Sequence, residues 1–157
     1  MRGTTFAMIV TAVLAAMVGL LHSDASADTL IVVNSSSDVI ADDGVCTLRE
    51  AVNSANFDFS PFSTAGECAA GSGTDQISFN IAGAPDFTNG GQNGYRISLT
   101  SPLPSLTDPV DINGFSQPGA LANTAPNPQP LNTRILVEVD GSAAGMTAGA
   151  GENAFDF

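Results

Sequence analysis

The stretch "CTLREAVNSAN", residues 46–56, predicts a short helix in a chain whose other segments predict strands. Thr47 and Glu50 have the spacing of a capping box, in which each side chain accepts a hydrogen bond from the other residue's amide. The apolar positions recur at i, i+3, i+4 and i+7 and form one stripe: Leu48, Ala51, Val52 and Ala55. Arg49 is predicted to lie off this stripe. A helix this short does not hold alone in water, so we expect its stripe to cover an apolar surface.

The first 27 residues have the composition of a secretory signal peptide. Arg2 gives a positive start, residues 6–21 carry no charge, and Ala25-Ser26-Ala27 are small residues of the kind a signal peptidase reads. The alternative is a membrane anchor, but the apolar run is shorter than the roughly 20 residues needed to span a bilayer. We expect export to the cell surface or the medium, and one mature domain, residues 28–157, with no membrane insertion.

The charge balance is strongly acidic, with a formal net charge of −12. Without the leader, the cations are Arg49, Arg96 and Arg134, and the chain has no lysine. Because phosphate binding depends on Lys and Arg, this composition argues against nucleic acid and anionic membranes as partners. It also disfavours a polyanionic sugar chain unless calcium bridges the two.

The two cysteines, Cys46 and Cys68, favour a disulfide, because the chain is predicted to be exported and their number is even. Two free thiols or half of a metal site are the alternatives. The sequence has no C-x-x-C, and its only histidine, His22, belongs to the leader, so a zinc site is disfavoured.

Short strand-like runs separated by Gly, Pro and Asn predict a mostly β fold. They are residues 29–33, 76–81, 95–100, 109–114, 134–141 and 153–157. Residues 110–114, "VDING", resemble residues 137–141, "VEVDG", at an offset of 27. A repeat of this length favours a solenoid or a propeller, although one repeated pair also fits a small sandwich.

The motif Cys46-Thr47-Leu48-Arg49-Glu50-Ala51, after a leader and a short strand, resembles the bacterial CSLREA-domain proteins. Threonine stands here where the family's motif has serine, and both can cap a helix. The stretch "ISLTSPLPSLTDPVDINGFSQPGA", residues 97–120, is similar to the first coils of the right-handed parallel β-helix, of pectin-lyase type, that follows this motif. The resemblance implies a cap at residues 28–74 and first coils at residues 75–157. Since the last run stops abruptly, we expect a fragment.

Two carboxylates, Asp111 and Glu138, occupy equivalent positions in the repeat. In coils aligned in register they would stack on the outer face, with Asn113 and Asp140 extending a polar ladder that could bind a ligand or calcium. A solvated outer face is the simpler interpretation. The sequence predicts no catalytic residue and no protein-bound metal or other cofactor; calcium is the sole candidate ion.

The expected function is structural. The chain would form the N-terminal region of a secreted or cell-surface β-helix protein that is adhesive or binds glycans. The alternative is the N-terminal part of a polysaccharide lyase or hydrolase whose site lies mostly beyond residue 157. The sequence leaves catalysis undecided and favours a non-enzymatic role for this segment.

Overall fold

The computed structural model describes residues 27–89 and 91–145. The predicted signal peptide, apart from Ala27, and the strand predicted at residues 153–157 lie outside these residues. Within them the chain is mostly β with one short helix, which confirms the predicted fold class at that level. The elements are β1 (Leu30–Val33), α2 (Leu48–Phe57), β2 (Asp75–Phe79), β3 (Phe87–Asn89), β4 (Gln92–Ser98), β5 (Val110–Asn113) and β6 (Val137–Asp140).

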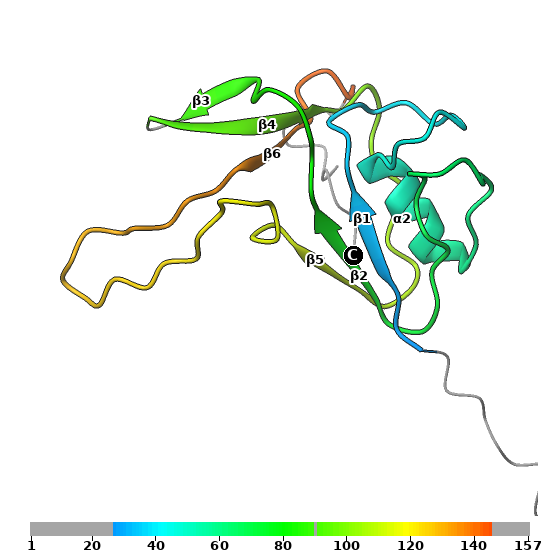
Figure 1. Ribbon diagram of the computed structural model, residues 1–157, viewed down its shortest axis with the longest axis horizontal. Helices are drawn as coiled ribbons and strands as arrows, with labels where there is room; N and C mark the ends of the chain where they lie inside the picture. Colours follow the sequence, from blue (N-terminus) through cyan, green and yellow to red (C-terminus); the bar gives the residue numbers. More distant parts are fainter. Residues whose placement is uncertain (1–26, 90, 146–157) are drawn as a thin grey trace, which may run out of the picture.

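The strands form two three-stranded sheets, β1-β2-β5 and β3-β4-β6. Every pairing in the first sheet is parallel, as is β4 with β6, whereas β3 and β4 form an antiparallel hairpin. From β2 onward the chain visits the sheets in turn: β2, then β4, then β5, then β6 (Figure 1). Each circuit of the chain therefore adds one parallel strand to each sheet.

Alternation along the strands builds the core. Ile31 of β1 aligns with Ile77 of β2, which aligns with Ile112 of β5. In the other sheet Ile97 of β4 aligns with Val139 of β6. Successive side chains of a strand point to opposite faces, so these aligned residues form apolar rows on the inner side. Ile31, Ile77 and Ile97 are fully buried, while Ile112 and Val139, in the last strands, are half-buried.

The helix α2 packs against β1 and β2 (Figure 1). The predicted apolar stripe is the face that it buries, because Leu48, Ala51 and Val52 have no exposed surface and Ala55 has 1%. The helix ends at Asp58, whose backbone takes the left-handed conformation and donates to the Ser54 carbonyl. No helix among the described residues is long and apolar enough to cross a membrane.

A long connection, residues 114–136, joins β5 to β6 and extends away from α2 (yellow to orange in Figure 1). We call it the arm. Its two limbs are bridged by Leu121 and Arg134, whose backbones exchange hydrogen bonds of 3.0 and 2.7 Å. At its base the buried Gln117 side chain pairs with both backbone groups of Ile81 in the manner of a strand.

Candidate functional site

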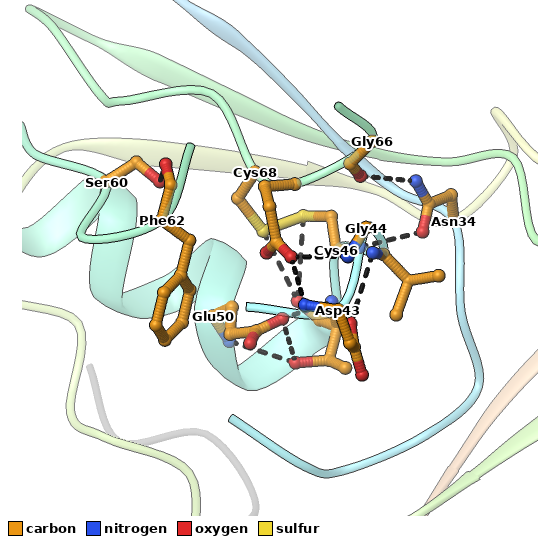
Figure 2. Close-up of a disulfide and its surroundings, with 12 residues drawn as sticks. Asn34, Asp43, Gly44, Cys46, Glu50, Ser60, Phe62, Gly66 and Cys68 are labelled. Carbon is orange, nitrogen blue, oxygen red and sulfur yellow. Dashed lines mark hydrogen bonds between the residues drawn. A yellow bond between two sulfur atoms is a disulfide. The ribbon is translucent and has the colours of Figure 1, made fainter. Parts of the chain in front are cut away.

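The motif Cys46–Ala51 lies where α2 meets β1 and the loop that carries Cys68 (Figure 2). Cys46 and Cys68 form a disulfide with 4.7 Å between their Cα atoms, which confirms the pairing predicted from sequence. Both cysteines are buried. The bond joins the residue before the helix N-cap to Cys68, within the loop between α2 and β2, so it fixes the first turn of α2.

The capping box is also confirmed. The Glu50 amide donates to Thr47 Oγ1 over 3.3 Å, and the Thr47 amide donates to Glu50 Oε2 over 2.9 Å. Glu50 Oε1 accepts a further bond of 2.9 Å from the Ala41 amide. Glu50 is only 5% exposed, and both of its carboxylate oxygens accept hydrogen bonds. These bonds offset the free-energy cost of burying the polar group.

Arg49 lies off the apolar stripe of α2, yet it is buried, with only 8% of its surface exposed. Its Nε and Nη2 atoms bind the two carboxylate oxygens of Asp38 at 2.9 and 3.0 Å. The same guanidinium donates to the carbonyls of Ser101 and Pro102, 52 and 53 residues further along the chain. Arg49 therefore joins the loop before α2 to the segment after β4.

Asp38 receives its own set of donors. Besides Arg49, the amide and hydroxyl of Thr100 donate to it over 2.8 and 2.7 Å. Burial opposes ionisation of this carboxyl, but the hydrogen bonds from Arg49 and Thr100 outweigh it and hold the pKa of Asp38 below its ordinary value of 3.8.

Acid should therefore destabilise the fold through Asp38. Its folded pKa is lowered, so the charged network contributes its full stability above pH 3.8, and the contribution is lost as the pH falls through the folded pKa. We expect the free energy of unfolding to fall as the pH drops below about 4, and to fall less steeply in Asp38→Asn. Urea unfolding at several pH values measures this, and parallel slopes for the two proteins would contradict it.

The loop that carries Cys68 is held to the segment before the helix by the Asn34 side chain and by a close approach of the two backbones. The Asn34 side chain accepts from the Cys46 amide and donates to the Gly66 carbonyl, both over 2.8 Å (Figure 2). A Cβ at Gly66 would lie 2.0 Å from the Gly44 carbonyl oxygen, and Gly66 has a φ of +104°. Only glycine allows this approach.

The predicted carboxylate ladder does not form. Asp111 lies in β5 opposite Gln76, whereas Glu138 lies in β6 opposite Arg96, so the two carboxylates belong to different sheets. The offset of 27 residues separates consecutive strands of one circuit, not strands stacked on each other. The stacked partners are 35 residues apart for Ile77 and Ile112.

Each carboxylate of the proposed calcium face has a separate neighbour. Asp111 accepts from Gln76 over 3.4 Å, and Glu138 pairs with Arg96 over 3.3 Å. The Ser142 amide binds Asp140 over 2.9 Å and lowers its pKa. Across residues 27–89 and 91–145, no group of three or more His, Cys, Asp or Glu side chains could hold a metal ion. The arrangement does not support a calcium ladder on this face.

Three structural features were not predicted from the sequence. They are the Arg49–Asp38 pair, the bonds of the Asn34 side chain to Cys46 and Gly66, and the strand β3. Asp38 lies in a polar loop 11 residues before its partner, and no spacing rule connects the two.

Comparison of the chain with protein-family models, with curated proteins and with solved structures finds no match.

Proposed function

We propose that residues 28–74 cap the first coil of a right-handed parallel β-helix in a secreted or cell-surface protein of CSLREA type, and that the role of this segment is structural. The proposal is supported by the structural role of each of the six motif residues, 46–51. Cys46 is in the disulfide, Thr47 and Glu50 cap the helix, and Arg49 joins two loops. The remaining two, Leu48 and Ala51, are fully buried. Every motif residue thus stabilises the fold.

The burial gradient supports the same proposal. The aligned apolar side chains are fully buried in β1 and β2, next to α2, and only half-buried in the last strands, β5 and β6. A solenoid needs such a closing element, because its first coil otherwise presents apolar side chains and unpaired strand edges. The alternation of the chain between two sheets is what coil stacking requires.

Removing the disulfide tests the cap. Cys46→Ser/Cys68→Ser should lose roughly 3 kcal/mol, since the bond closes a loop of 22 residues. We expect a melting temperature about 10 °C lower and increased self-association, measured by circular dichroism and light scattering. Reducing the wild type should reproduce this state, and reducing the variant should change nothing. A double variant that melts and scatters light like the wild type would contradict the cap.

The proposed non-catalytic role has its own test. The chain, with and without calcium, is incubated with neutral and acidic polysaccharides, and new reducing ends and unsaturated sugars are measured. We expect the chain to bind a glycan without releasing new reducing ends or unsaturated sugars. Calcium-dependent release of unsaturated sugars would instead favour a polysaccharide lyase.

A further inference from the structure

A pocket of about 260 Å³ lies between the β3–β4 hairpin and the returning limb of the arm. Its lining is polar at most positions: Gly91, Gln92, Asn93, Arg134 and Leu136. The two walls are joined by bonds from the Gln92 side chain to the Thr133 carbonyl, 3.3 Å, and from the Tyr95 amide to the Leu136 carbonyl, 2.8 Å. The pocket is therefore built from two connected elements.

The charge around this pocket differs from that of the whole chain. The chain has 16 acidic residues, yet residues 87–107 and 112–137 contain none. Both walls come from these two acid-free stretches. The acid next to the hairpin, Asp86, is bonded to the backbone of Gly94 and Arg96.

Arg134 differs from the other two arginines of the described chain. Arg49 is paired with Asp38 and Arg96 with Glu138, but no carboxylate in the described ranges lies within 4.0 Å of Arg134. Its Nη1 donates to the Gly119 carbonyl over 3.2 Å, which orients the guanidinium. The pocket thus holds a positioned cation without an ionic partner.

We propose that this pocket binds an acidic sugar residue, with the sugar carboxylate on Arg134. A guanidinium binds a carboxylate through parallel charge-assisted hydrogen bonds. Asn93 accepts from Thr88 through its Oδ1, so its amide NH₂ is the group that would face sugar hydroxyls. The inference goes beyond the proposed structural role and names a ligand class. The net charge of −12 favours an isolated acidic residue over a long polyanion.

Titration of the full chain with D-glucuronate, followed by two-dimensional amide NMR, tests the site. The matched ligands are D-glucose and inorganic phosphate, and the variants are Arg134→Gln and, as control, Arg96→Gln. We expect glucuronate to shift the amides of Gln92, Asn93 and Arg134, and Arg134→Gln to weaken binding at least about tenfold. Arg96→Gln, whose arginine already has an acidic partner, should bind as the wild type does.

Three results would overturn the proposal: unchanged glucuronate binding by Arg134→Gln, equal binding of glucose, or phosphate binding as tight as that of glucuronate. The last would identify a general anion site. Thermal melts of both variants establish that they are folded. The cap is tested separately by the cysteine variant, whose substitutions lie in the α2 region. Failure of the sugar site with the expected cysteine result would leave the structural proposal standing.

Discussion

Leu48→Asp is expected to abolish cooperative folding at neutral pH. Leu48 has no exposed surface and lies in the first turn of α2, on the face packed against β1 and β2. Loss of a buried leucine costs about 2–5 kcal/mol, and burying an unpaired carboxylate adds several more. The sum is comparable with the whole stability of an ordinary domain, about 5–15 kcal/mol.

Circular dichroism melts and light scattering measure this effect. The matched control is Asn53→Asp, which adds the same charge to the same helix at a half-buried position. We expect the control to melt cooperatively near the wild-type temperature, and Leu48→Asp to show no cooperative transition and to self-associate. A cooperative melt of Leu48→Asp close to that of the control would show that this face does not close the core.

Arg49→Ala is expected to cost about 3–5 kcal/mol, because it leaves the buried Asp38 carboxylate without its cation. The side chains of Arg49 and Asp38 are 10% and 3% exposed. The Ser101 and Pro102 carbonyls would lose their donors as well. Urea unfolding monitored by circular dichroism gives the change in free energy.

Arg96→Ala provides the comparison. The side chains of Arg96 and Glu138 are 42% and 40% exposed, and a pair in water contributes about 0–1 kcal/mol. Both variants remove one arginine from an arginine–carboxylate pair, so the difference between them measures the effect of burial together with the two carbonyl bonds of Arg49. Equal losses of stability in the two variants would contradict the role assigned to the Arg49 network.

Local patterns predicted the parts of the fold that depend on nearby residues. The capping box and the apolar stripe of α2 follow from spacings of three and four residues, and both are present. The strand predicted at residues 134–141 begins only at Val137, because Arg134 instead pairs with Leu121 across the arm. The hydropathy of residues 134–141 does not indicate that Arg134 pairs with Leu121.

Stacking could not be predicted from the repeat. The similarity of residues 110–114 to residues 137–141 reflects a shared local requirement, an alternating strand followed by a turn. It carries no information on which strands pair, because pairing depends on the length of the intervening connections. Those connections differ: β2 precedes its partner β5 by 35 residues, and β4 precedes β6 by 42, from Ile97 to Val139.

The Asn34 side chain, which binds Cys46 on one side and Gly66 on the other, also belongs to an Asn-Ser-Ser acceptor pattern for N-glycosylation. Attachment of a glycan would replace one amide hydrogen and place a bulky group between segments that are 2.8 Å from that side chain. Because Asn34 is half-buried and its Nδ2 already donates to Gly66, a glycan there would compete with this contact. In a host that glycosylates during translocation, modification and oxidative folding would compete for the same nascent chain. The chain modified at Asn34 would then be the one in which the loop between Cys46 and Cys68 does not close.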